Sequence, residues 1–247
     1  MKNGIIFDNV SFAHKNGLFQ LENINLYIPR GIFCGITGIN GSGKTTLTLL
    51  INGLIPHQIR GTLKGNVYLD NVNTKEKPVS YFAKSVGMIF QNPDFMLFNL
   101  TVKEEIEFGL KNLKLNNHNL RIKEALKIIN LSGYENRDPQ TLSFGQKQKI
   151  CLAAVLAQDS DYIVLDEPTA MLDYQSTVDL YKLLKSLNQQ GKTIIVVEHD
   201  TDFLNEYTDQ TIVLNQGRIA LKGKTKAVLS ETKKLEQIGI KIPRLEL

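Results

Sequence analysis

Gly38-Ile-Asn-Gly41-Ser-Gly43-Lys44-Thr45 is the stretch of sequence that decides the fold of this 247-residue chain. The apolar run 32–37 before it predicts a buried strand, and the apolar positions within 44–52 after it predict a helix. A glycine-rich loop between a strand and a helix is the context of a phosphate-binding P-loop. Its backbone N–H groups curl around phosphate oxygens, and the helix N-terminus adds partial positive charge.

The residues of this loop predict a nucleotide site. Lys44 is expected to reach the β- and γ-phosphates, and the Thr45 hydroxyl is expected to coordinate Mg²⁺. The nucleotide-binding residues that we predict from the loop are Gly38, Asn40, Gly41, Ser42, Gly43, Lys44, Thr45 and Thr46.

A second run of residues places two carboxylates at the end of a strand. Tyr162-Ile-Val-Leu-Asp166 is apolar until its last residue, and Glu167-Pro168 follows. In open α/β sheets, ligands bind at the carboxyl ends of the strands. We therefore expect Asp166 to hold the Mg²⁺ shell and Glu167 to orient and deprotonate an attacking water. Two adjacent carboxylates are a weak signal alone, and the P-loop makes them informative.

The composition is that of an ordinary globular protein. Hydrophobic residues make up 42% of the chain and charged residues 22%, which excludes a disordered, collagen-like or disulfide-stapled class. Cys34 and Cys151 each lie in an apolar run, which is typical of buried thiols in a reducing compartment. The N-terminal residues predict no signal peptide. No apolar stretch approaches the ~20 residues of a membrane-spanning helix.

The net charge of +4 comes from the C-terminal end. Residues 221–247 contain seven Lys and Arg against three Asp and Glu, and the first 220 residues balance at 22 against 22. We expect a solvated helix face in this basic tail. Contact of the tail with a membrane surface or a nucleic acid is the alternative interpretation.

The middle of the chain predicts helices. Thr101 and Glu104 form a capping-box pattern, and an apolar stripe follows at Val102, Ile106, Leu110 and Leu113. A second helix is expected over about residues 118–131. A third begins at Ser143, where Gln146 completes another capping box. Because residues 92–160 hold no strong strand pattern, we interpret them as an inserted helical subdomain.

Strand patterns lie on both sides of this helical stretch. Residues 162–166 and 193–198 are short and apolar, as in parallel strands buried on both faces. Residues 211–221 predict a hairpin, and the N-terminal strands predict an antiparallel subdomain with a bulge at Asp8–Asn9. We predict one α/β domain over 1–247, with a mainly parallel core. It comprises a core with the β-subdomain at 1–91 and 161–220, the helical subdomain at 92–160 and the basic tail at 221–247.

Further motifs resemble those of ABC-type ATPases. Leu142-Ser143-Phe144-Gly145-Gln146 is similar to the signature motif of that family, usually Leu-Ser-Gly-Gly-Gln. Gln91 resembles the Q-loop glutamine, Ala170-Met171-Leu172-Asp173 the D-loop, and Glu198-His199-Asp200 the switch histidine. With the P-loop and the carboxylate pair, six motifs occur in family order. The resemblance covers the whole chain and implies the P-loop ABC ATPase fold.

The resemblance implies an ATPase that acts as a head-to-tail pair. Two ATP molecules would lie between the P-loop of one subunit and the signature motif of the other. His199 would hydrogen-bond the γ-phosphate, and Gln91 would sense Mg²⁺ and water. The implied site comprises catalytic Glu167, His199, Gln91 and Lys44, metal-binding Thr45, Gln91 and Asp166, and nucleotide-binding Ser143, Gly145, Gln146 and Asp173 besides the P-loop.

Two residues depart from the family pattern. Phe144 replaces the first glycine of the signature motif, so packing there must differ, and its effect on activity stays open. His14 stands where the family usually places an aromatic residue that stacks on adenine. We predict His14 as the base contact and Phe12 as strand core.

Residues 91–113, QNPDFMLFNLTVKEEIEFGLKNL, are similar to the ATPases of energy-coupling factor importers of vitamins and transition-metal ions. In that branch two ATPases, identical or paralogous, sit under a transmembrane coupling protein, and a small membrane protein binds the substrate. The resemblance implies a peripheral protein at the cytoplasmic face of the membrane, with no nucleic-acid partner. We expect Asp94, Glu104 and Glu105 to form an acidic rim that receives arginines of the coupling protein. Simple helix capping is an equal alternative for Glu104.

Three alternative functions fit parts of the sequence. The first is that the chain powers an ABC transporter outside the energy-coupling factor branch. A soluble mechanical ATPase of DNA repair, chromosome structure or translation is disfavoured, because the chain has one cassette and no sustained heptads. A non-enzymatic regulator is disfavoured because Glu167 and His199 are both present. The sequence leaves open the solute, the choice between homodimer and heterodimer, and whether the chain is half of a fused double ATPase.

Overall fold

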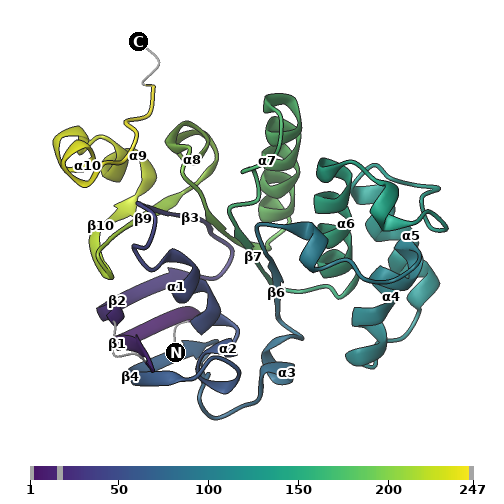
Figure 1. Cartoon of the computed structure of the whole chain (residues 1–247), viewed down its shortest axis with the longest axis horizontal. Coiled ribbons are helices and arrows are strands. Elements are labelled where there is room, and N and C mark those ends of the chain that lie inside the picture. Colours follow the sequence, from purple (N-terminus) through teal and green to yellow (C-terminus); the bar gives the residue numbers. More distant parts are fainter. Residues whose placement is uncertain (1–2, 16–18, 245–247) are drawn as a thin grey trace.

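The N-terminal strands form an antiparallel sheet of order β2-β1-β4-β5 in a computed structural model that describes residues 3–15 and 19–244 (Figure 1). Its strands are β1 (Gly4–His14), β2 (Phe19–Pro29), β4 (Gly61–Leu69) and β5 (Val72–Asn73). Ile5, Phe7, Val10 and Phe12 point into the core. The register shifts between Phe7 and Val10, which confirms the bulge that the sequence predicts.

The six-stranded core sheet has the order β10-β9-β3-β8-β7-β6. Its strands are β3 (Phe33–Gly38), β6 (Val86–Ile89), β7 (Tyr162–Asp166), β8 (Thr193–Val197), β9 (Gln210–Asn215) and β10 (Arg218–Lys224). All neighbouring pairs are parallel except β9–β10, which form the predicted hairpin. Every residue of β3, β7 and β8 is buried, because helices or the second sheet cover both faces.

The helices divide into two groups. α4, α5 and α6 gather on the far side of β6 and β7 from α1 (Figure 1), and residues 92–160 contain no strand. The helices are α1 (Lys44–Ile51), α2 (Leu54–His57), α3 (Val79–Phe82), α4 (Val102–Asn112), α5 (His118–Ile128), α6 (Phe144–Ala157), α7 (Tyr174–Gln189), α8 (Thr201–Tyr207), α9 (Thr225–Leu229) and α10 (Thr232–Ile238), with 3₁₀ turns at Pro93–Phe95 and Pro139–Thr141.

Both predicted capping boxes are present. The Thr101 side chain accepts from the Glu104 N–H, and the Glu104 carboxylate accepts from the Thr101 N–H. Ser143 and Gln146 make the same reciprocal pair at α6. These local patterns therefore place the starts of two helices that bear on function.

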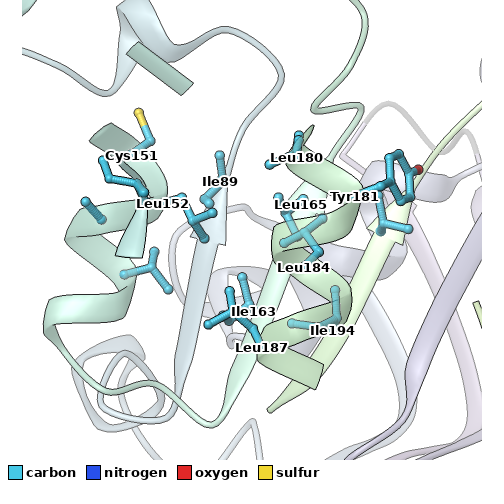
Figure 2. Packing of buried hydrophobic residues seen from close by; sticks show 14 of the residues in the cluster. Ile89, Cys151, Leu152, Ile163, Leu165, Leu180, Tyr181, Leu184, Leu187 and Ile194 are labelled. Atoms are coloured by element: carbon cyan, nitrogen blue, oxygen red, sulfur yellow. The ribbon is translucent and has the colours of Figure 1, made fainter. Parts of the chain in front are cut away.

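The hydrophobic core holds the helices to the sheet. Leu152 of α6 lies near Ile89 of β6, and one face of α7 covers β7 and β8 (Figure 2). The contacts between α7 and these strands involve Ile163, Leu165, Leu180, Leu184, Leu187 and Ile194. Cys34 and Cys151 are free and buried, which confirms the prediction for both thiols. Burial raises the pKa of Cys151 to about 12.

The C-terminal region has a solvated face and a buried one. β10 continues through Lys224, so a boundary at residue 221 would cut a strand. Lys233, Lys234 and Glu236 of α10 are exposed, which agrees with the expected solvated helix face. Leu229, Leu235 and Ile240 join the main core cluster. Among the described residues, no helix has the length and apolarity needed to cross a bilayer.

Candidate functional site

The loop from Gly38 to Gly43 joins β3 to α1 and has a backbone that only glycine fits at two points. Gly43 has φ +100°, and a Cβ there would lie 2.6 Å from the Gln20 carbonyl oxygen. A Cβ on Gly38 would lie 2.3 Å from the Leu214 carbonyl oxygen. Neighbouring backbone thus packs directly against the loop at both glycines, so a side chain at either position would clash.

Lys44 lies folded along this loop. Its Nζ donates to the Gly38 carbonyl at 3.0 Å and to the Ile39 carbonyl at 3.2 Å, and it lies 3.8 Å from Glu167 Oε1. Burial lowers the pKa of Lys44, whereas Glu167 and Asp166 act to raise it. An ammonium group that is buried with few counter-charges favours an anionic ligand such as a phosphate.

Asp166 ends β7 beside Thr45. The carboxylate is buried, and Oδ1 has no hydrogen-bond partner among the described residues. Burial raises its pKa, and a hydrogen bond with Thr45 opposes the rise. A hard divalent cation would satisfy this unpaired oxygen, and carboxylate and hydroxyl oxygens are ligands that Mg²⁺ prefers. The residues therefore fit Mg²⁺.

This donor set also matches the number of protein ligands that Mg²⁺ needs beside a nucleotide. The described residues hold no cluster of three or more His, Cys, Asp and Glu that would bind a metal alone. Mg²⁺ on a nucleotide takes only one or two carboxylates from the protein, and phosphate oxygens and water complete its shell.

Glu167 is the point where three strand ends meet. Oε1 lies 2.9 Å from His199 Nε2 after β8, and Oε2 accepts from Gln91 Nε2 at 3.1 Å after β6. Because a carboxylate only accepts, the His199 proton sits on Nε2. Glu167 has φ +48°, a sparsely populated conformation for a non-glycine residue. Such backbone strain gathers at functional sites.

The signature residues lie apart from this group. Ser143 is exposed at the start of α6, and α6 and α1 stand on different sides of β6 and β7 (Figure 1). Gly145 faces Leu172 and Ser176 of the D-loop region. The structure thus brings together Lys44, Asp166, Glu167, His199 and Gln91. Ser143, Gly145 and Gln146 form a second group.

Phe144 and Asp173 have clear local roles. Phe144 is half-buried in the first turn of α6, and the capping box around it is intact. Asp173 caps α7 by accepting from the Ser176 N–H at 2.7 Å and the Ser176 hydroxyl at 3.1 Å. These hydrogen bonds lower the pKa of Asp173, so this carboxylate is charged at the end of the D-loop.

At the end of β1, His14 packs edge-to-face on Phe12 at 5.0 Å between ring centres. Phe12 is fully buried, which confirms it as strand core. Contact of His14 with a base stays a prediction.

Sequence reasoning missed two supports of the site. Glu198 is buried, accepts from the N–H groups of His199 (2.7 Å) and Asp200 (3.3 Å), and pairs with the Thr169 hydroxyl. The Gly217 N–H donates to the Ser42 carbonyl at 3.1 Å, so the β9–β10 turn supports the P-loop. A carboxylate in an apolar strand run was a signal for Glu198. No local signal marked the second support.

A group of exposed apolar side chains follows Gln91 in the sequence, on the loop before α4 and on α4. We call it the Q-loop surface and define it as Phe95, Phe98, Leu100 and Phe108. Phe98 and Leu100 are 63% and 81% exposed, and Phe98 contacts Phe108 edge-to-face at 4.9 Å. A concentrated patch of this kind is typical of a protein-binding surface.

The acidic rim expected here is wrong for Glu105. Glu105 is buried, and its Oε2 accepts from the N–H groups of Phe98 and Asn99. The Glu104 carboxylate accepts from the Thr101 N–H in the capping box, which favours the capping alternative. Asp94 pairs with Lys147 at 2.6 Å. The sequence could not show that α4 turns Glu105 inward to hold its own preceding loop.

Comparisons with known proteins agree with this arrangement. A family model described as ABC transporter matches residues 21–170. A protein of Pyrococcus horikoshii, with the provisional name ABC transporter ATP-binding protein, is 45% identical over 98% of this chain and 86% of its own length. The energy-coupling factor transporter ATP-binding protein EcfA of Methanocaldococcus jannaschii is 39% identical over 95% of this chain and 84% of its own length.

Solved structures show the same fold. The structure of cbiO1 from Clostridium perfringens, part of the ABC transporter complex cbiONQ, has a TM-score of 0.84 and 31% identity, and covers 99% of this chain and 97% of its own. A dimeric ATP-binding cassette in a post-hydrolysis state with ADP and Pi has a TM-score of 0.79 and 31% identity, over 90% and 98% of the two chains. ABC ATPases work as dimers of this kind.

Proposed function

Because this chain belongs to the ABC transporter family of ATP-binding subunits and is an ATPase, we propose that it powers an importer of the energy-coupling factor type. The solute would be a vitamin or a transition-metal ion. The likeness to EcfA and cbiO1 and the sequence of residues 91–113 support this branch. The relative at 45% identity is named only as a transporter subunit, which keeps another transporter class as the second candidate.

The observation that carries the catalytic assignment is the meeting of Lys44, Gln91 and His199 around Glu167. Glu167 acts as the general base that takes a proton from the attacking water. Gln91 and His199 contact its two oxygens, which fixes the orientation of the carboxylate toward the attacking water. When ATP is bound, His199 would turn its one Nε2–H from Glu167 to the γ-phosphate.

The P-loop binds the phosphates of ATP. Lys44 exchanges its two carbonyl partners for β- and γ-phosphate oxygens, which satisfy the ammonium better than neutral carbonyls do. Mg²⁺, held by Asp166 and Thr45 near Gln91, would neutralise charge on the same phosphates. His14 would contact the base.

The second group of residues acts across a dimer. Ser143, Gly145 and Gln146 stand at the N-terminus of α6, and a helix N-terminus favours an anion. Because α6 lies apart from α1 within one chain, these residues would bind the γ-phosphate held by the other subunit. Asp173 would face that shared site. ATP thereby joins the two subunits, and hydrolysis releases them.

The Q-loop surface would receive the transmembrane coupling protein. It offers exposed aromatic and aliphatic side chains, and Asp94 and Glu104 are exposed in the same segment. Its partner segment would therefore carry apolar side chains. Docking there would place the chain at the cytoplasmic face of the membrane as a peripheral subunit, with a small substrate-binding membrane protein in the same complex.

The test is a tagged pull-down from detergent-solubilised membranes of the native host, with mass spectrometry of the co-purifying proteins. Recovery of a polytopic coupling protein and a small membrane binder supports the importer. Phe98→Asp should abolish this recovery, whereas Leu120→Asp, on exposed α5, should retain it. Recovery of only ribosomes or nucleic-acid complexes would contradict the proposal, and recovery of a different membrane partner would favour the second candidate.

A further inference from the structure

The last described residues turn back toward the ATPase site. α10 ends at Ile238 and is capped by Gly239, which has φ +84°, and the chain then runs beside the start of α8. We call residues 239–244 the C-terminal strap. Ile240 is buried in the main core cluster, so the strap is anchored from inside. The mechanism described above uses none of these residues.

The strap binds each of the three residues that follow His199. Lys241 Nζ lies 2.8 Å from Asp200 Oδ1 and 2.7 Å from Asp202 Oδ2. The Thr201 hydroxyl donates to the Lys241 carbonyl at 2.9 Å. The Arg244 N–H donates to Asp202 Oδ1 at 2.6 Å. Asp200 also caps α8, so Lys241 holds the cap itself.

The strap also reaches the P-loop. A Cβ on Gly239 would lie 3.7 Å from Ile39 Cγ2, an ordinary van der Waals contact. Gly38, Ile39 and His199 line a cavity of about 210 Å³ together with Gly239 and Lys241. The strap therefore closes one wall of the space between the phosphate loop and the switch histidine.

The arrangement is a network rather than a single surface ion pair. One ammonium group is shared by two carboxylates, and two backbone hydrogen bonds act beside it. Although burial acts to lower the pKa of Lys241, the hydrogen bonds to Asp200 and Asp202 raise it. An isolated surface ion pair contributes little to stability, whereas a network of ion pairs and hydrogen bonds holds the linked side chains in place. The effect of the strap should therefore appear in catalysis more than in stability.

We propose that the C-terminal strap is a positioning element of the ATPase site, in which Lys241 acts through Asp200 and Asp202 to hold His199 in line with Glu167. The proposal rests on the role of His199 given under the proposed function. The His199 side chain is 45% exposed, and Glu198 holds the His199 backbone N–H rather than its ring. Misplacing a catalytic group by about 1 Å costs up to about 10²-fold in rate.

The test compares the full-length variants Lys241→Ala, Lys241→Arg and Lys234→Ala. Lys234 is the matched control, because it is an exposed lysine of α10 that pairs with Glu231 at the start of the same helix. We expect Lys241→Ala to lower kcat about tenfold with KM for ATP within about twofold, since the phosphate grip is untouched. Lys241→Arg should restore most of kcat, and Lys234→Ala should match wild type.

Two further variants separate the strap from the assignment on which it rests. If His199→Ala hydrolyses ATP at the wild-type rate, the proposed role of His199 fails. If His199→Ala is strongly slowed but measurable and Lys241→Ala has normal kcat, the strap proposal alone is overturned, even where Lys241→Ala lowers Tm. Lys241→Ala should cause no further loss in the His199→Ala background, and an additive loss would also overturn it. Asp202→Asn replaces Lys241→Ala if that variant does not fold.

Discussion

Replacing Glu105 should release the loop that carries the Q-loop surface. Its Oε2 accepts from the Phe98 N–H at 2.9 Å, the Asn99 N–H at 2.9 Å and Asn99 Nδ2 at 3.0 Å. The residue is 7% exposed, so water cannot easily replace these bonds. One carboxylate oxygen thus fixes the backbone next to the exposed Phe98 ring.

The magnitude follows from the number and type of these bonds. A hydrogen bond to a charged group contributes about 1.5–3 kcal/mol and a neutral one about 0.5–1.5 kcal/mol. Glu105→Gln keeps an acceptor oxygen and weakens three bonds, which should cost about 2–3 kcal/mol of unfolding free energy. Glu105→Ala leaves two backbone N–H groups without a partner and should cost about 4 kcal/mol.

The assay is urea unfolding of the full chain, combined with hydrogen exchange. The amides of Phe98 and Asn99 should lose protection in Glu105→Ala. Glu104→Gln is the matched control, because it stands in the same turn and supplies only half of a capping box. It should cost no more than about 1 kcal/mol. The membrane pull-down should fail for Glu105→Ala and succeed for Glu104→Gln.

An unfolding free energy of Glu105→Ala within about 0.5 kcal/mol of wild type would refute this reasoning, since that value is typical of an ordinary surface substitution. Unchanged exchange at Phe98 would also refute it. A loss equal in Glu104→Gln and Glu105→Ala would mean that helix capping, rather than the anchored loop, accounts for the effect.

Three further predictions concern the ATPase site. Glu167→Gln should slow hydrolysis about 10²–10⁴-fold while retaining ATP-dependent dimerisation in gel filtration, and near-wild-type turnover would contradict the assigned base. Lys44→Ala should weaken ATP binding in calorimetry, and an unchanged Kd would remove the P-loop assignment. Burial raises the pKa of Glu198 above its ordinary value of 4.5, so the stability that its protonated form contributes is lost as pH rises through the folded-state pKa. The Tm of Glu198→Gln minus that of wild type should therefore be larger at about pH 7.5 than at about pH 4.5. The same Tm difference at both pH values would show that the pKa of Glu198 is not raised in the folded state.

Local chemistry explains what the sequence could predict. Gly38 to Thr45 can only be read as a phosphate loop, because glycine is needed where the backbone packs against backbone. Thr101 and Ser143 predict the starts of their helices because Glu104 and Gln146, three positions later, complete capping boxes. The carboxylates after β7 and the histidine after β8 follow from where parallel strands end. Each of these signals lies within a few residues of the feature it predicts.

Long-range packing explains what the sequence could not predict. Lys241 looked like one charge of a basic tail, and its partners are about forty positions away at Asp200 and Asp202. Glu105 looked like part of an acidic face, and only the turn of the chain before α4 gives it a buried role. A sequence predicts that such charged residues are solvated, and only the fold shows which of them has a partner.

The separation of the two groups of site residues links catalysis to assembly. Within one chain, both oxygens of Glu167 are engaged by His199 and Gln91, and the signature residues stand on the other side of β6 and β7. In the proposed dimer each subunit completes its partner's site. Gln91 precedes the Q-loop surface, and His199 precedes the segment held by the strap. Movement of the membrane partner would therefore act on the Glu167 carboxylate through Gln91. The position of the C-terminal strap would act on the same carboxylate through His199.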